Sequence, residues 1–150
     1  MANLAPILLV EDNPRDLELT LAALSKCQLA NEIVIARDGA EALDYLYQRG
    51  PHADRAEGDP AVVLLDLKLP KVDGLEVLET VKTDAARRQI PVVMLTSSRE
   101  ERDLVKSYEL GVNAFVIKPV DFNAFFEAIQ DLGMFWAILN EPPPRGANRA

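Results

Sequence analysis

The chain has 150 residues, a single cysteine and a formal net charge of -8. This length favours one domain with a substantial core over two folded modules, and the acidic balance disfavours nonspecific nucleic-acid binding, which needs clustered Lys and Arg. Cys27 alone cannot form a disulfide framework and fits a reducing compartment. Neither a signal peptide nor a membrane span is visible, so we expect a cytoplasmic protein with protein partners.

The sequence alternates short apolar runs with helical patterns. After the apolar run over residues 7–10, leucines at helical spacing predict a helix over about 14–26, with Asn13 as its N-cap. A short strand over residues 32–36 leads into a second helix, which ends near the strong stop signal Gly50-Pro51. The elements expected next are a surface loop over 51–60, a strand over 61–65, a helix around 77–81, a strand over 92–95, a helix over 99–110, a strand over 114–117 and a last helix from Asp121 to about Leu139.

The apolar runs are continuous rather than alternating, which is typical of strands buried on both faces of a parallel sheet. Such a sheet is covered by helices and binds its ligands at the carboxyl ends of its strands. Four of the runs end in reactive side chains, namely Glu11-Asp12, Asp66, Thr96 and Lys118. A single polar residue can simply mark where a strand stops, but four such ends together favour a functional site.

These side chains suit phosphoryl chemistry. Carboxylates crowded at one rim repel, because two unit charges about 4 Å apart cost roughly 4 kcal/mol at an effective dielectric near 20. Mg²⁺ removes this cost, since it binds a few carboxylates together with waters and phosphate oxygens. Asp66 is then a candidate nucleophile for an aspartyl-phosphate, and the Lys118 ammonium and Thr96 hydroxyl can bind the phosphoryl oxygens.

On these residues the chain resembles the receiver domain of a two-component response regulator. The resemblance covers about residues 6–132 and rests on residues 7–12, 64–66, 69–74, 95–97 and 115–119. It implies an α/β fold, a flavodoxin-like doubly wound five-stranded parallel sheet in the order 2-1-3-4-5. It also implies that a sensor histidine kinase phosphorylates Asp66. The Mg²⁺ ligands that it implies are Glu11, Asp12, Asp66 and the backbone carbonyl of Lys68.

The same resemblance implies a switch made by Thr96 and Phe115, in which the hydroxyl moves toward the phosphate and the ring turns into the vacated space. By itself, Phe115 would be interpreted as a core residue. Ser97 is bulkier than the smallest residues that receivers use there, which is expected to slow access to the phosphoryl group. Lys118 must turn sharply toward the acids, so we expect a cis bond before Pro119, an isomer that costs only about 0.5–1 kcal/mol at X–Pro.

A narrower resemblance is to the single-domain regulators paired with bacterial phytochromes. It rests on the loop over 51–60 and the segments 107–113 and 134–136. On the extended last helix, Met134, Phe135 and Ile138 fall outside the apolar face, and adjoining exposed apolar residues mark an interface. We expect a homodimer through this helix and the neighbouring helix–strand face. The alternatives are that the helix docks a downstream protein, or that its end folds onto the monomer's own core.

We expect a receiver domain over residues 1–140 and a disordered tail over 141–150, for which a polyproline docking motif is the alternative. The rival from another class is a phosphatase of the haloacid dehalogenase type, which needs a second Asp two positions after the nucleophile. Lys68 stands there, so we expect a signalling domain with only slow self-catalysed phosphotransfer and dephosphorylation, not an enzyme. A pseudo-receiver would have a broken pocket, whereas all the pocket side chains are present.

Overall fold

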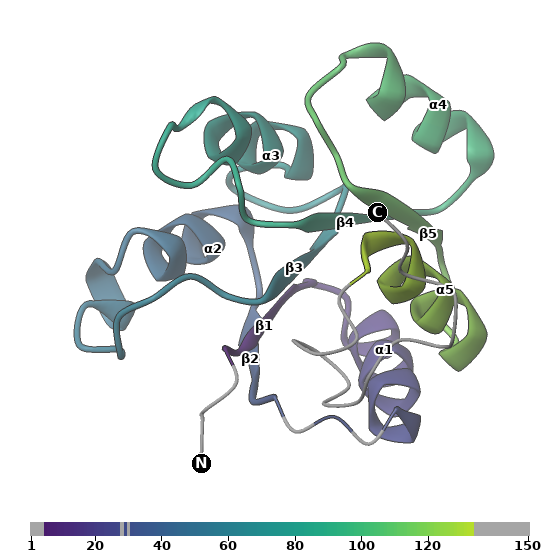
Figure 1. Ribbon diagram of the computed structural model, residues 1–150, viewed down its shortest axis with the longest axis horizontal. Coiled ribbons are helices and arrows are strands. Elements are labelled where there is room, and N and C mark those ends of the chain that lie inside the picture. Colours follow the sequence, from purple (N-terminus) through teal and green to yellow (C-terminus); the bar gives the residue numbers. More distant parts are fainter. Residues whose placement is uncertain (1–4, 28, 30, 134–150) are drawn as a thin grey trace.

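Five parallel strands form one sheet at the centre of the molecule (Figure 1). The computed structural model describes residues 5–27, 29 and 31–133. The spatial order is β2-β1-β3-β4-β5, which confirms the expected doubly wound sheet. The strands are β1 (Ile7–Val10), β2 (Ile33–Ala36), β3 (Val62–Asp66), β4 (Val92–Thr96) and β5 (Ala114–Ile117).

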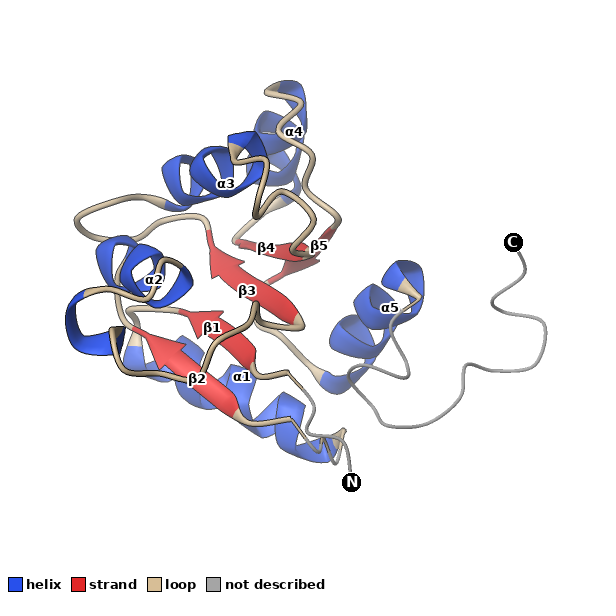
Figure 2. Cartoon of the chain, turned by 60° about the vertical axis from the view of Figure 1, so that its left-hand side comes forward, coloured by secondary structure: helices blue, strands red, loops and turns tan. Residues whose placement is uncertain are grey.

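Helices cover both faces of this sheet (Figure 2). They are α1 (Pro14–Lys26), α2 (Gly39–Leu46), α3 (Gly74–Thr83), α4 (Arg99–Ser107) and α5 (Phe122–Leu132), with a short 3₁₀ helix η1 (Gly50–His52). The buried side chains of α2, α3 and α4 join one apolar cluster, and those of α1 and α5 join a second cluster on the opposite face. Within the described ranges, no helix is long and apolar enough to cross a membrane.

The continuous apolar runs are explained by this two-sided covering. In β1, Leu8 and Val10 belong to the cluster under α2 and α3, whereas Ile7 and Leu9 belong to the cluster under α1 and α5. Successive side chains of a strand point to opposite faces, and here both faces are buried. Every residue of β1 therefore has to be apolar.

Each α-helix begins at a polar N-cap that lies shortly after the end of a strand. The cap side chain accepts the backbone N–H of the residue three positions later, which satisfies one of the unpaired donors of the first turn. The caps are Asn13, Asp38, Asp73, Ser98 and Asp121. The expected caps Asn13 and Asp121 are thus confirmed.

The segment between α2 and β3 is more structured than its lack of apolar periodicity indicates. It contains η1, and the Arg55 side chain folds back so that Nε donates to the Tyr45 carbonyl at 2.6 Å. The Arg55 guanidinium lies 4.1 Å from the centre of the Tyr45 ring. His52, the only histidine, contacts Glu41 at 3.1 Å and meets the same ring edge-on. These tertiary contacts, rather than periodicity, order the loop.

The last helix is shorter than expected. α5 ends at Leu132, and Gly133 adopts the left-handed conformation with φ 66°, which is the common way to close a helix at its carboxyl end. The expectation of one uninterrupted helix to about Leu139 is therefore wrong at Gly133. Met134, Phe135 and Ile138, together with the tail over 141–150, lie outside the described residues.

Candidate phosphorylation site

Strand register brings the reactive side chains to one rim. Val10 pairs with Leu65 and Asp66 pairs with Leu95, so the end of β3 lies between the residues that follow β1 and the end of β4. Thr96 pairs with Ile117 in the next ladder, which places Lys118 on the same rim. The rim lies where strand order reverses, because β2 and β3 flank β1 on opposite sides. In sheets of this type that position is the ligand site.

Three carboxylates form the acidic part of the site. Glu11, Asp12 and Asp66 each offer an oxygen atom, and these atoms lie within 4.8 Å of one another. Glu11 and Asp66 are buried, whereas Asp12 is exposed. Among the described residues, Glu11 Oε1 accepts no hydrogen bond although it is inaccessible to solvent. A buried carboxylate oxygen without a donor, in a set made only of oxygen ligands, fits a hard divalent cation.

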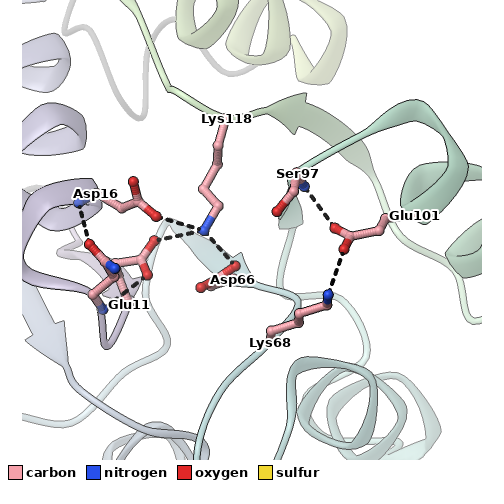
Figure 3. Close-up of polar contacts among 8 residues, drawn as sticks. Glu11, Asp16, Asp66, Lys68, Ser97, Glu101 and Lys118 are labelled. Atoms are coloured by element: carbon pink, nitrogen blue, oxygen red, sulfur yellow. Dashed lines mark hydrogen bonds and ion pairs between the residues drawn. The ribbon is translucent and has the colours of Figure 1, made fainter.

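Lys118 is the cation that balances these acids (Figure 3). Its Nζ atom lies 3.1 Å from Asp66 Oδ1, 3.0 Å from Asp16 Oδ2 and 3.6 Å from Glu11 Oε1. Burial opposes the charge on Lys118, but the hydrogen bond to Asp16 and the charges of Asp66 and Glu11 outweigh it and raise the pKa of the ammonium above its usual value. Lys118 therefore stays protonated at any physiological pH.

The pKa of Glu11 is higher than that of an ordinary surface carboxyl. Burial, the hydrogen bond with Asp66 and the charge of Asp66 raise the pKa of Glu11 to about 8, while Lys118 and the Asn13 backbone N–H pull it down. Asn13 N–H donates to Glu11 Oε2 at 3.3 Å. Without a bound cation, Glu11 therefore gives up its proton less readily than a free carboxyl does.

The hydroxyl side of the rim is built differently. Thr96 is fully buried at the end of β4, and its Oγ1 has no hydrogen-bond partner among the described residues. Phe115 is half-buried against the α3 and α4 side of the core, and Lys106 Nζ lies 5.7 Å from the centre of its ring. A buried hydroxyl without a partner is available to donate a hydrogen bond to a bound ligand.

Glu101, which was not predicted from the sequence, contacts both Lys68 and Ser97. Glu101, in the first turn of α4, accepts the Ser97 backbone N–H at 2.7 Å and lies 3.1 Å from Lys68 Nζ. The Lys68 side chain, 79% exposed, thus points toward α4 rather than toward the acids (Figure 3). Glu101 stands three residues after the N-cap Ser98, which is the capping-box spacing that could have revealed it.

The backbone around the site is tightly constrained. A Cβ atom on Gly74 would lie 2.3 Å from the Asp66 carbonyl oxygen, so this position has room for glycine alone and α3 starts directly against the end of β3. The Lys118-Pro119 peptide bond is cis, the isomer expected from the sequence. Lys118 N–H donates to the Thr96 carbonyl at 2.7 Å, which joins the ammonium-bearing and hydroxyl-bearing strand ends.

Solved structures and curated proteins resemble this chain over most of its length. The bacteriophytochrome response regulator AtBRR is 77% identical with a TM-score of 0.88, covering 93% of this chain and 100% of that one. The phosphorylated cyanobacterial phytochrome response regulator RcpA is 41% identical with a TM-score of 0.71, covering 90% of this chain and 94% of that one.

A third relative is response regulator Rcp1 of Synechocystis sp. It is 40% identical over 130 residues, which are 87% of each chain. The Mn²⁺-bound form of response regulator Rcp1 has a TM-score of 0.70 at 39% identity, covering 89% of this chain and 94% of that one. The family model of the response regulator receiver domain matches residues 7–130. The chain therefore belongs to the family of response regulator receiver domains.

Proposed function

We propose that this receiver is a single-domain response regulator that accepts a phosphoryl group on Asp66 from a sensor histidine kinase. The observation that carries the proposal is the ion pair of 3.1 Å between buried Asp66 and Lys118, beside two further carboxylates. The phosphorylated state of RcpA supports it, as a property of that relative.

The reaction assigns a role to each side chain of the rim. An Asp66 oxygen attacks the phosphorus of a phosphohistidine, so that an O–P bond forms while the N–P bond breaks and the imidazole leaves. The Lys118 ammonium lies against Asp66 and can neutralise one phosphoryl oxygen. The Thr96 hydroxyl, which lacks a partner among the described residues, can donate to another.

A divalent cation fits the acidic part of the site. Glu11, Asp12 and Asp66 would hold it together with the Lys68 backbone carbonyl, and when bound it would supply charge neutralisation to the phosphoryl oxygens. The Mn²⁺-bound form of response regulator Rcp1 supports a divalent metal, as a property of that relative. Mg²⁺ is our choice for this chain, because an all-oxygen ligand set suits a hard cation.

The partners follow from the relatives and from the sequence. The names of AtBRR and RcpA support a phytochrome-type histidine kinase as the phosphoryl donor, acting in the cytoplasm. We also propose a homodimer, with Met134, Phe135 and Ile138 at its interface beyond α5. The charge of -8 argues against nucleic acid as a partner.

Phosphorylation is tested with acetyl phosphate and Mg²⁺. Intact mass should show one added phosphoryl group in the wild type and none in Asp66→Ala. Asp59→Ala, which removes an exposed acid from the loop before β3, is the matched control and should be modified like the wild type. If a saturating donor gives no Mg²⁺-dependent adduct, the chain is a pseudo-receiver instead.

The dimer is tested separately by sedimentation. The double variant Phe135→Glu plus Ile138→Glu should lower the sedimentation mass to that of a monomer at tens of micromolar protein. An unchanged mass in this variant, or a wild type that is monomeric both before and after phosphorylation, would rule the dimer out.

A further inference from the structure

We propose that Asp16 is a positioning residue, which holds the Lys118 ammonium beside Asp66 when a metal and a phosphoryl group engage the other carboxylates. This inference rests on the proposed phosphorylation of Asp66. It gives a role to a side chain of α1 that is outside the Glu11, Asp12 and Asp66 cluster.

Lys118 Nζ donates a hydrogen bond to Asp16 Oδ2. Asp16 Oδ2 lies 3.0 Å from Nζ, against 3.1 Å for Asp66 and 3.6 Å for Glu11. Figure 3 shows these carboxylates converging on the ammonium. The Lys118 side chain is 14% exposed and that of Asp16 is 30% exposed, so the contact is partly shielded from water and the charge-assisted bond keeps part of its strength.

The start of α1 shows that this contact is not a by-product of helix capping. Asn13 caps α1 by accepting the Asp16 N–H at 3.0 Å. In a capping box, the third helical residue returns its side chain to the N-cap N–H. Here Glu11 Oε2 takes that N–H, and the Asp16 carboxylate instead reaches Lys118, 102 residues away in the chain. The local role of Asp16 is thereby filled by Glu11.

The need for such an anchor follows from the chemistry of the site. An ammonium has three N–H donors; in this state Nζ donates to Asp16 and also forms ion pairs with Asp66 and Glu11. A cation bound by Glu11 and Asp66 would draw their oxygens to itself, and phosphorylation would change the charge and shape of Asp66. Asp16 keeps its contact through both events. A donor that is already in place stabilises developing charge without reorganisation.

The first test observes Lys118 directly and does not depend on phosphorylation. In protein labelled with ¹⁵N-lysine, the Lys118 NH₃⁺ signal, assigned with Lys118→Arg, should persist in the wild type after Mg²⁺ is added. In Asp16→Ala with Mg²⁺, exchange of these protons with water should accelerate at least about tenfold. Glu18→Gln removes an exposed acid from the same helix and should leave the signal unchanged. A protected signal in Asp16→Ala overturns the proposal.

The second test separates positioning from charge. With acetyl phosphate as the donor, Asp16→Ala should lower the maximal phosphorylation rate about tenfold, while the Mg²⁺ concentration for half-maximal rate stays within about twofold. Asp16→Asn keeps an oxygen acceptor for Lys118 and the start of α1, so it should lose only about threefold. Rates equal to the wild type in both variants would contradict the proposal, since they would mean that Asp16 does not position Lys118. Faster rates would also contradict it, since they would mean that Asp16 merely repels the phosphoryl donor.

The two tests keep the two proposals apart. If wild-type Asp66 takes no phosphoryl group, the proposed function fails, while the lysine signal still reports whether Asp16 positions Lys118. If Asp66 is phosphorylated at the same rate in the wild type and in both Asp16 variants, the proposed function stands and the positioning role falls.

Discussion

The two sides of the candidate phosphorylation site differ in how completely their polar groups are bonded. On the side of α1, Lys118 contacts three carboxylates at 3.0 to 3.6 Å. On the side of α4, the buried Thr96 hydroxyl has no partner among the described residues, and Ser97 bonds to Glu101 near the surface. The charged groups of the first side are thus already paired, whereas the second side has a hydroxyl donor that is still available.

The helices behind the two sides, α1 and α4, differ in how many of their side chains are buried. α1 buries Leu17, Thr20, Ala23 and Leu24. Of the α4 side chains that the structure describes, Val105 alone is buried, and Leu104 is 50% exposed. A helix with few buried apolar residues opens or shifts at a low free-energy cost. A charge site held by ion pairs and a helix with few buried side chains therefore share one rim.

Removing the lysine of each side should give the largest contrast. Lys118→Met leaves buried carboxylates without their cation, so we expect the free energy of unfolding without Mg²⁺ to fall by about 3 kcal/mol and phosphorylation of Asp66 to slow about 100-fold. Lys68→Met removes an exposed ion pair and should change stability by less than about 0.5 kcal/mol. Urea denaturation and acetyl phosphate kinetics provide the measurements. Equal losses in the two variants would show that the two lysines contribute equally and that the two sides do not differ.

The pH dependence of Mg²⁺ binding should be the next largest effect. Because the pKa of Glu11 is raised to about 8, a proton competes with the metal at neutral pH. Apparent Mg²⁺ affinity should therefore rise up to about tenfold per pH unit from pH 6 to 8 and level off above. Calorimetry in two buffers of different ionisation enthalpy should detect about one released proton at pH 7. An affinity that is flat over this range would contradict a protonated Glu11.

Without metal, the contributions of Glu11 and Glu101 to the free energy of unfolding should change with pH in opposite directions. The raised pKa of Glu11 means that its favourable contribution is complete below its unfolded value of 4.5 and is lost as pH rises through about 8. The Ser97 N–H bond lowers the pKa of Glu101, so the contribution of Glu101 is present above 4.5 and is lost as pH falls further. Glu11→Gln should flatten the loss of stability between pH 5 and about 8, and Glu101→Gln should leave it in place.

A substitution of Thr96 should raise stability and weaken binding of a phosphoryl mimic. Thr96→Val removes a buried hydroxyl that lacks a described partner, so the free energy of unfolding should increase by about 1 kcal/mol. Binding of beryllofluoride, which mimics the phosphoryl group on Asp66, should weaken about tenfold through loss of that donor. Thr80→Val, whose hydroxyl donates to the Glu76 carbonyl, is the control for the side-chain change. A destabilised Thr96→Val protein would show that the hydroxyl is already bonded.

The smallest effect is expected at the surface of the α4 side. Glu101→Ala removes the acceptor of the Ser97 N–H and the partner of Lys68, so the free energy of unfolding should fall by about 0.5–1 kcal/mol. Beryllofluoride binding should become slightly stronger, because the Ser97 N–H is released from its present bond. Glu100→Ala, which changes the neighbouring exposed acid, is the matched control. Weaker beryllofluoride binding in Glu101→Ala would show that Glu101 supports the site instead of competing with it.

Local patterns in the sequence were sufficient to predict the five strands and the five α-helices of the described residues, together with the reactive residues at the strand ends, but not the 3₁₀ helix η1. The continuous apolar runs predicted the parallel strands, because burial on both faces leaves no place for alternation, and the runs' last residues identified Asp66, Thr96 and Lys118. The end of α5 was also readable, since a glycine at the carboxyl end of a helix is a common stop. The apolar pattern beyond Gly133 nevertheless suggested continuation to Leu139, and that prediction was wrong.

The tertiary structure alone decided which polar groups meet. Asp16 and Lys118 are 102 residues apart, and no periodicity in the chain connects them. Their contact exists because strand register sets the height of Lys118 at the rim, and burial of Leu17 and Leu24 against the sheet sets the rotation of α1. The same holds for Lys68 and Glu101, which approach only once β3 and β4 are paired. Sequence patterns encode which face of an element is buried, whereas the bonding state of each charge depends on how separate elements are placed in space.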